Sequence, residues 1–426
     1  MHIIDTVTME GFWGDRTLNF NLNEDVNFII GMNGSGKTTA VNLIVAALTA
    51  DFNELDRHDF SKIIIKLKTE SGRKKPSVTV IKTASKDSPF ATITYEIKES
   101  STDKAIVLSL DDYEEQMMLR RYPAHILERE LNRRHGRNVS ETLKRLVNVS
   151  WLSVHRSNIE KKYADEDKNE STVDKKLKEL SNRLVRYFSS LGKQGSELLE
   201  NFQKTVFLSM LHRKSYKPLF STVRDIDLEE EKKVLEGIFS QFKFTTVDFQ
   251  GKLDGHFDAL KKAKEKLSEA PNTLSTTDVS VLIGTERIDY IVDEWKKLLQ
   301  KRAEIFEPRD TYLAIVNSMM QRKEFRINDQ NELNIKTQSG KDLPIHRLSS
   351  GEKQLLIVLG EALLQEKNYW VYIADEPELS LHVKWQEALV PNLRAINPNS
   401  QIIFATHSPD VVSVYDDKIF DMERML

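Results

Sequence analysis

The sequence predicts an α/β fold in which a parallel sheet carries the functional segments and a long helical segment interrupts the chain. Two short apolar runs, residues 370–374 and 401–405, have the composition of buried parallel strands. A third apolar run, residues 26–30, is followed by a glycine-rich loop and then by an apolar helix pattern. From about residue 157 onward, apolar residues recur at spacings of three and four, which indicates long paired helices.

The first functional segment is the glycine loop, residues 31–39, with the sequence GMNGSGKTT. Its place between a strand and a helix is the setting that a phosphate-binding loop requires. Backbone N–H groups and the helix N-terminus can hold phosphates, while Lys37 adds a charge and Thr38 offers its hydroxyl to Mg²⁺. The residues expected to bind ATP here are Asn33, Gly34, Ser35, Gly36, Lys37, Thr38 and Thr39.

Two further segments follow the other apolar runs. The acidic turn, residues 375–378 (DEPE), begins where the first run ends, so Asp375 can hold Mg²⁺ and Glu376 can orient or deprotonate the attacking water. The histidine loop, residues 406–409 (THSP), places His407 where it can hydrogen-bond the γ-phosphate or that water. We therefore expect Glu376 and His407 to be catalytic, and Thr38 and Asp375 to be the metal ligands.

The signature segment, residues 348–354 (LSSGEKQ), precedes another apolar helix pattern. Its start makes a second anion-binding helix N-terminus, which a single site does not need. Ser350, Gly351 and Glu352 are therefore expected to contact the ATP that another copy of the chain holds. This arrangement predicts a homodimer, or a higher even-numbered homo-oligomer, with composite ATP sites.

Together, the four segments resemble the ABC-type ATPases of the SMC, Rad50 and OLD branch, with LSSGEKQ as the signature motif, IADEPE as Walker B and ATHSP as the switch histidine. The form DEPELSLH looks most like the OLD-type and anti-phage-defence ATPases, such as those of the PARIS and Septu systems. The resemblance covers about residues 1–155 and 325–426. It implies an ABC-type P-loop ATPase head, built from N- and C-terminal lobes, with an inserted helical arm.

The sequence divides into an N-terminal ATPase lobe (residues 1–156), an inserted arm or lid (157–324) and a C-terminal lobe (325–426). The first lobe contains short strand patterns that suggest an antiparallel sheet, followed by a last strand before the insertion. These patterns cover residues 63–67, 78–81, 92–97, 105–110 and 151–155.

The arm begins with a helix of about 35–40 residues, because one apolar seam continues from Val173 to Val206. Two shorter helices are expected at residues 225–239 and 248–270. The residues from Ile288 to Phe306 mark a return helix, which should break near Pro308, since proline cannot continue the hydrogen-bond ladder of a helix.

Composition restricts the class of protein. The 426 residues include no cysteine, which excludes disulfides, a thiol nucleophile, Cys-ligated zinc and the zinc hook that joins Rad50-like arms. The formal net charge of −3 disfavours a surface covered with nucleic-acid contacts, although it permits a local patch. No run approaches the roughly 18 apolar residues of a membrane span, and the N-terminus does not resemble a signal peptide, so we expect a cytoplasmic protein without membrane contact.

Three local assignments stay open. ABC proteins carry a glutamine after the strand at residues 151–155, but this chain offers only His155, Arg156 or Asn158, unless the role is unfilled. The basic residues at 133–137 and 72–75 suit either a solvated surface or contact with DNA or a partner. The segment before the glycine loop suits either adenine or ribose contact or core packing, through Phe12, Trp13 and Arg16.

Two function classes fit this reading. In the first, the chain is the ATPase sensor and scaffold of an anti-phage defence system, with DNA or a phage protein as its trigger. A nuclease effector is then expected on a separate polypeptide encoded nearby, because the chain carries no second acidic site and ends soon after His407. In the second, it is a Rad50- or SMC-like subunit of a DNA repair or recombination complex. The missing zinc hook, the short arm and the DEPELSLH form favour defence.

Overall fold

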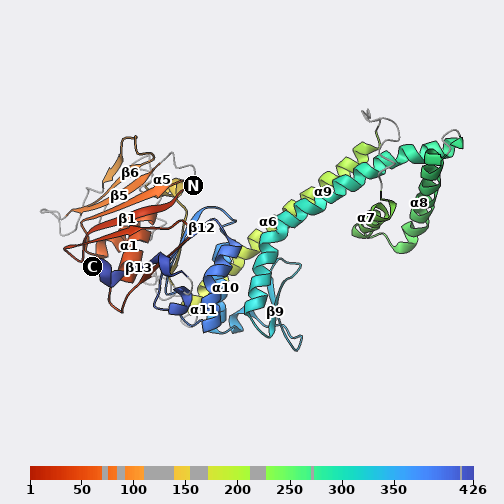
Figure 1. Cartoon of the computed structure of the whole chain (residues 1–426). Coiled ribbons are helices and arrows are strands. Elements are labelled where there is room, and N and C mark those ends of the chain that lie inside the picture. Colours follow the sequence, from red (N-terminus) through yellow and green to blue (C-terminus); the bar gives the residue numbers. More distant parts are fainter. Residues whose placement is uncertain are drawn as a thin grey trace. The chain divides into compact units, whose positions relative to one another are not determined.

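The computed structural model describes residues 1–69, 75–83, 92–109, 139–153, 171–211, 227–269, 273–412 and 415–426. The chain forms two compact units. One unit contains Met1–Tyr187 and Pro308–Leu426, and the other contains Phe188–Glu307. The first is a layered α/β structure and the second consists of helices (Figure 1). The α/β fold with an inserted helical arm, expected from the sequence, is thereby confirmed.

A five-stranded parallel sheet carries the functional segments, in the order β13-β3-β12-β11-β8. Its members are β3 (Val26–Ile30), β8 (Val149–Ser153), β11 (Trp370–Asp375), β12 (Ser400–Ala405) and β13 (Ile419–Asp421). Parallel strands all end at the same edge of a sheet. The glycine loop, the acidic turn and the histidine loop follow β3, β11 and β12, which are neighbours, so the sheet brings these three segments to one edge.

A six-stranded antiparallel sheet has the order β2-β1-β4-β5-β6-β7. In β4, every second residue is buried, because Ile63, Ile65 and Leu67 all point to the core face. The strands expected within this sheet are confirmed, whereas β1 and β2 were not predicted. The bounds are β1 (Ile3–Phe12), β2 (Arg16–Asn21), β4 (Lys62–Lys68), β5 (Ser77–Thr83), β6 (Thr92–Lys98) and β7 (Ile106–Ser109).

Helix α1 (Lys37–Thr49) lies between the two sheets. It contacts β5 of the antiparallel sheet and β8, β11 and β12 of the parallel sheet, and most of its residues are buried. A helix that is apolar on all sides is stable only when it is enclosed in this way. The core therefore surrounds the helix that begins at the glycine loop, which fixes the start of that helix in space.

The remaining helices of this unit cover its surface. Helix α10 (Ser350–Leu363) packs on the parallel sheet, where the Tyr372 hydroxyl of β11 donates to the Val358 carbonyl oxygen at 3.2 Å. The other elements are a β9–β10 hairpin, Lys323–Ile327 and Leu333–Thr337, and the helices α5 (Val139–Leu146), α11 (Val383–Ile396), α12 (Pro409–Val412) and α13 (Met422–Met425).

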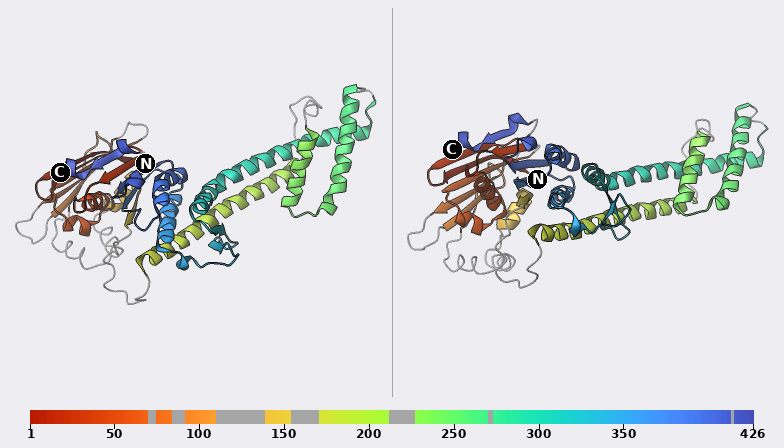
Figure 2. Two further views of the ribbon diagram at one scale, coloured as in Figure 1. Left: turned by 60° about the horizontal axis from the view of Figure 1, so that its bottom comes forward. Right: turned by 90° about the horizontal axis from the view of Figure 1, so that it is seen from below.

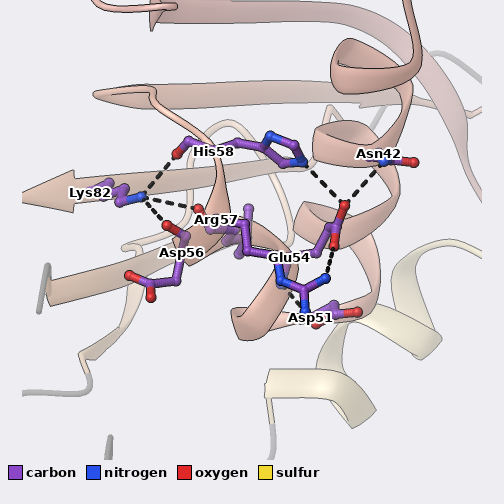
Figure 3. A network of polar contacts seen from close by, with 8 residues as sticks. Asn42, Asp51, Glu54, Asp56, Arg57, His58 and Lys82 are labelled. Atoms are coloured by element: carbon purple, nitrogen blue, oxygen red, sulfur yellow. Dashed lines mark hydrogen bonds and ion pairs between the residues drawn. The ribbon is translucent and has the colours of Figure 1, made fainter. Parts of the chain in front are cut away.

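A polar network fixes the corner that follows α1 (Figure 3). The Glu54 carboxylate of α2 (Phe52–Arg57) accepts a hydrogen bond from Asn42 of α1 at 3.1 Å. The Lys82 ammonium of β5 donates to three carbonyl oxygens at the end of α2, those of Leu55, Asp56 and His58. Burial lowers the pKa of Lys82, against the attraction of nearby aspartates, so the ammonium depends on these carbonyl oxygens for its solvation.

The helical unit contains α7 (Leu228–Gln241), α8 (Thr246–Glu269) and most of α6 (Thr172–Ser209) and α9 (Thr276–Met319). Helices α6 and α9 run side by side in all views (Figures 1 and 2). Phe202 of α6 and Trp295 of α9 meet edge to face in the core of this unit, with ring centroids 5.0 Å apart. The expected long helix and the two shorter helices are therefore confirmed. No described helix has both the length and the apolar composition of a membrane span.

One expectation about the arm was wrong. The return helix does not break near Pro308, because α9 continues through this residue to Met319. Proline inside a helix removes one hydrogen bond and costs about 3 kcal/mol. The turns that follow Pro308 bury Tyr312 and Val316 completely, and the burial of such side chains is worth about 1.5–3 kcal/mol each. Packing after the proline therefore outweighs the break.

Candidate ATPase site

The glycine loop has a backbone that only glycine adopts easily. Gly34 and Gly36 have φ angles of 85° and 90°, in the left-handed region. Gly36 caps α1 and, as a glycine, has no side chain to accept a hydrogen bond from the first N–H groups of this helix, whose first turn contains no acidic residue. The N-terminus of α1 is therefore open to an anion.

Lys37 is folded back over the glycine loop. Its ammonium donates to the carbonyl oxygens of Gly31 at 2.8 Å and Met32 at 3.0 Å, and the residue is 5% exposed. An ammonium has three donors, so one is left for a ligand. The nearby Ser35 hydroxyl is buried without a hydrogen-bond partner in the described part of the chain, which adds a second group available to a phosphate.

The other loop residues that the sequence assigned to ATP binding surround this point. Asn33 and Gly34 are exposed, and Thr39 follows Thr38 in the first turn of α1. The Thr38 hydroxyl donates to the Asp375 carboxylate at 3.1 Å. The structure thus brings the two expected metal ligands together, although the sequence separates them widely.

Negative charge surrounds Lys37. Burial lowers the pKa of its ammonium, and the carboxylates of Glu376, Asp375, Glu423 and Glu378 act in the opposite direction. The described residues include no group of three or more His, Asp or Glu side chains arranged to hold a metal. A divalent cation at Thr38 and Asp375 would consequently take most of its ligands from water and nucleotide, which is the usual preference of Mg²⁺.

Glu376 and His407 meet at the edge of the sheet. His407 Nε2 lies 3.8 Å from Glu376 Oε1, and the side chains are 35% and 34% exposed. The Glu376 backbone is left-handed, with φ 49°, and its N–H donates to the Ala405 carbonyl oxygen at 2.8 Å. A non-glycine residue in this region is strained and is held there by its surroundings. Both predicted catalytic side chains thus face the open end of the site.

The signature segment begins α10 and has other partners. Ser349 and Glu352 form a capping box at the start of this helix, and Glu352 also pairs with Lys323. Burial acts to raise the pKa of Glu352, but the hydrogen bonds from Lys323 and Ser349 outweigh it and leave the pKa below its usual value. The Glu352 carboxylate is therefore engaged with its own helix end.

The rest of the signature segment contacts the start of α6 and the acidic turn. Lys353 pairs with Asp174 at 2.6 Å, and the Gln354 amide donates to the Pro377 carbonyl oxygen at 2.9 Å. Gly351 packs against the backbone of Ser380. These partners lie outside the glycine loop. The structure of one chain thus joins the glycine loop, acidic turn and histidine loop, and keeps Ser350 and Gly351 on a separate helix.

A family model for the AAA ATPase domain matches residues 3–412, nearly the whole chain. The chain belongs to the AAA ATPase domain family. Membership of this family supports nucleotide binding and ATPase activity for the chain in general.

Shorter matches link the ATPase to curated proteins. A segment of 86 residues is 37% identical to a Retron Vc95 probable ATPase from Vibrio cholerae serotype O1 biovar El Tor, and covers 18% of this chain and 17% of that protein. A segment of 87 residues is 31% identical to a Retron Ec83 probable ATPase from Escherichia coli, and covers 18% of this chain and 16% of that protein. Each match therefore spans about a sixth of the relative.

Solved structures of Smc head domains align with most of the ATPase at low identity. The head from Pyrococcus furiosus, with an extended coiled coil and bound to the C-terminal domain of ScpA, is 14% identical with a TM-score of 0.46, and the match covers 97% of this chain and 92% of that chain. The head from Thermotoga maritima is 12% identical with a TM-score of 0.39, over 96% and 90% of the two chains.

Three polar residues of the ATPase site were given no role from the sequence. Glu378 is buried beside the histidine loop and Glu423 accepts a hydrogen bond from the Met32 N–H at 2.8 Å. Gln386 accepts from the Ser408 hydroxyl at 2.7 Å. Of these three residues, only Glu378 could have been noticed in the sequence, because it is a third acid in the same turn as Asp375 and Glu376.

The open assignments near the ATPase site have different outcomes. Phe12 is fully buried and belongs to the core, whereas Trp13 is 43% exposed and packs beside Gly36. Arg16 begins β2 and is exposed. The other assignments lie outside the described residues, namely His155, Arg156, Asn158, the basic residues 133–137 and residues 72–74.

Proposed function

We propose that this ATPase hydrolyses ATP with Mg²⁺ and works as the sensor and scaffold of an anti-phage defence system, in which it controls a separate nuclease effector. The observation that carries the chemical part is the meeting of Thr38 and Asp375, at 3.1 Å, beside the buried ammonium of Lys37. The site lies at the open N-terminus of α1, where phosphates bind well.

Each residue has a role that suits its position. Lys37 and the N–H groups of the glycine loop bind the phosphates, and Thr38 and Asp375 hold the cation, which neutralises charge on the phosphates. Glu376 orients the attacking water and accepts its proton. His407, 3.8 Å away, hydrogen-bonds the same water or the γ-phosphate. Both roles require access for water and nucleotide, which fits the partial exposure of the Glu376 and His407 side chains.

Ser350 and Gly351 act in trans in this proposal. They begin α10, and the partners of this helix lie outside the glycine loop of the same chain. A second copy would supply them to the nucleotide, with the N–H groups of its α10 facing the γ-phosphate. The resulting unit is a homodimer or a higher even-numbered assembly with composite sites.

The defence role is supported by the matched segments of the two retron ATPases, together with the DEPELSLH form of the acidic turn. The trigger in this proposal is DNA or a phage protein. Because each match covers about a sixth of its relative, the effector is inferred as a class, a nuclease on another polypeptide.

A pair of variants tests the chemistry. Glu376→Gln should keep ATP affinity and lower turnover roughly 10²–10⁴-fold, the usual size of a general-base contribution, whereas Lys37→Ala should lose ATP binding. Measuring ATP turnover and nucleotide binding for each variant separates a loss of catalysis from a loss of binding. Turnover measured with Mg²⁺ and with excess chelator tests the dependence on the cation. Turnover by Glu376→Gln within threefold of wild type would contradict the assignment.

The defence role needs a cellular test. The gene with its native neighbours is expressed against a panel of phages, and plating efficiency is compared with the Lys37→Ala and Glu376→Gln versions. Protection that depends on both residues supports the proposal. Equal plating for all three, together with tight ATP-dependent binding of the purified protein to DNA ends, would favour the repair class instead.

A further inference from the structure

Glu378 is the last acid of the acidic turn, and it is 6% exposed. One of its carboxylate oxygens, Oε1, accepts hydrogen bonds from the Thr406 hydroxyl and from the His407 backbone N–H, the latter at 3.2 Å. Glu378 therefore contacts the backbone of His407, a proposed catalytic residue, and the side chain of Thr406, the residue before it. The Thr38 hydroxyl, in contrast, donates to Asp375.

The same loop is tied to the acidic turn at a second point. The Ser408 N–H donates to the Thr406 hydroxyl oxygen at 3.0 Å, and the Ser408 hydroxyl donates to Gln386 at 2.7 Å. The Gln386 amide in turn donates to the Leu381 carbonyl oxygen at 2.9 Å, just after the acidic turn. Residues on both sides of His407 are thus bonded to the segment that contains Glu376.

The second oxygen of Glu378, Oε2, is buried without a hydrogen-bond partner in the described residues. Burial raises the pKa of this carboxyl, the bonds from Thr406 and His407 oppose the rise, and the nearby Glu376 charge adds to it. A buried acid with an unsatisfied oxygen is costly for folding. Leucine or methionine would fill the same space but would leave the Thr406 hydroxyl and the His407 N–H without an acceptor, so the carboxylate is needed to hold these two groups of the histidine loop.

We propose that Glu378 is a positioning residue, which holds the histidine loop so that the His407 imidazole faces Glu376. The inference rests on the proposed ATPase chemistry, in which these two side chains act on the same water. Glu378 then affects turnover mainly through His407, and its charge has a smaller effect on the Lys37 ammonium than the charges of Glu376 and Asp375. A displacement of about 1 Å can lower a rate about 10²-fold, so a hydrogen-bonded support of this kind matters.

The test compares Glu378→Ala with Glu378→Gln. Alanine removes the acceptor, so kcat should fall about 10–100-fold while ATP affinity stays within threefold of wild type. Glutamine keeps an acceptor oxygen for Thr406 and His407 and should restore kcat to within about threefold. A kcat for Glu378→Ala close to wild type, or an equal loss in both variants, would overturn the positioning role.

A double-mutant cycle distinguishes a positioning role of Glu378 from a general effect on stability. In a His407→Ala background, Glu378→Ala should cause little further loss of kcat, because the residue acts through the imidazole. Losses that multiply would show an independent effect and contradict the proposal. If Glu378→Ala does not fold, Thr406→Val removes the hydroxyl donor with a side chain of similar shape, and the same cycle with His407→Ala decides.

The wild-type protein separates the two levels of inference. If it does not hydrolyse ATP at all, the proposed function fails, and the role of Glu378 fails with it. If it hydrolyses ATP, and Glu378→Ala does so equally well, the positioning role alone is wrong.

Discussion

Backbone strain at single residues marks the border of the site. Glu376 and Ser380 have φ angles of 49° and 69°, although neither is glycine. Each such residue costs about 1–3 kcal/mol and persists only where its surroundings determine its conformation. Glu376 directly follows the end of β11, and its N–H is held by the Ala405 carbonyl oxygen at the end of the neighbouring strand β12. The surroundings of Ser380 include Gly351, which packs directly on its carbonyl oxygen.

Gly351→Ala tests this contact. A methyl group at Gly351 would overlap the Ser380 carbonyl oxygen, which is backbone and cannot turn away. We expect a loss of about 1–3 kcal/mol in the free energy of unfolding, because overpacking forces the backbone to move. Urea unfolding of the variant and the wild type measures this loss of stability. The matched control is Gly237→Ala in α7, where an added Cβ would meet no described atom within 4 Å beyond the backbone of its own helix, and where alanine should stabilise by about 0.5–1 kcal/mol. Equal gains in both variants would disprove the close contact.

At the scale of elements, the pairing of α7 with α9 includes a buried acid. Glu231 of α7 is 5% exposed, and in its ionised form neither oxygen has a hydrogen-bond partner in the part of the chain that is described. Burial raises the pKa of Glu231 to about 8, and Asp289 of α9, to which the protonated carboxyl donates, adds to the rise. The two carboxyls can lie together because they share one proton.

This pair makes the helical unit sensitive to pH. The pKa of Glu231 is raised from 4.5 to about 8 on folding, so between these values the folded state keeps a proton that the unfolded state releases. Stability therefore falls as pH rises through this window and levels off above pH 8. Glu231→Gln removes this dependence and should gain about 1–3 kcal/mol over wild type between pH 5 and pH 8.5. Denaturant unfolding at several pH values measures the gain.

An exposed acid on the next helix is the control for that measurement. Glu265→Gln in α8 replaces an exposed side chain and should shift stability by less than about 0.5 kcal/mol. If Glu231→Gln tracks wild type across the whole pH range, the carboxyl is not buried as a shared-proton pair.

At the scale of the whole molecule, the proposed composite site makes activity a property of two chains. Lys37→Ala damages the glycine loop and Ser350→Arg damages the start of α10, so each protein alone should be inactive. Mixing them should form some dimers with one intact site, and ATP turnover should recover to about a quarter of the wild-type rate or less. If differently tagged chains exchange and no activity returns, the two segments do not act across an interface as proposed.

Much of this organisation could be read from the sequence, where the local pattern and the packing agree. In strands β4, β5 and β6 burial alternates from residue to residue, and in the first part of α6 the buried leucines recur three to seven residues apart, at Leu177, Leu180, Leu184 and Leu191. In β1 the period breaks, because a register shift between Ile4 and Thr6 moves the buried positions, and the strand was missed. At Pro308 the local rule was clear, but the burial of later residues decided the outcome.

The site shows the same division. Residues at strand ends were identified, because each follows an apolar run within a few positions. Glu423 was not, since its bond to Met32 exists only because β13 joins the edge of the parallel sheet next to β3. Glu378 lay inside a recognised segment, yet its bonds to Thr406 and His407 depend on the neighbouring strand. The role of a residue cannot be predicted from the local sequence pattern when its partner comes from a distant segment of the chain.

The continuation of α9 through Pro308 has a mechanical consequence. The helix passes between the two compact units at this residue, where its ladder lacks one N–H donor. A helix resists bending through the hydrogen bonds between its successive turns, and one of these bonds is missing at Pro308. The bending stiffness of α9 is therefore lowest at this residue. Bending then concentrates there instead of spreading over the 44 residues of the helix.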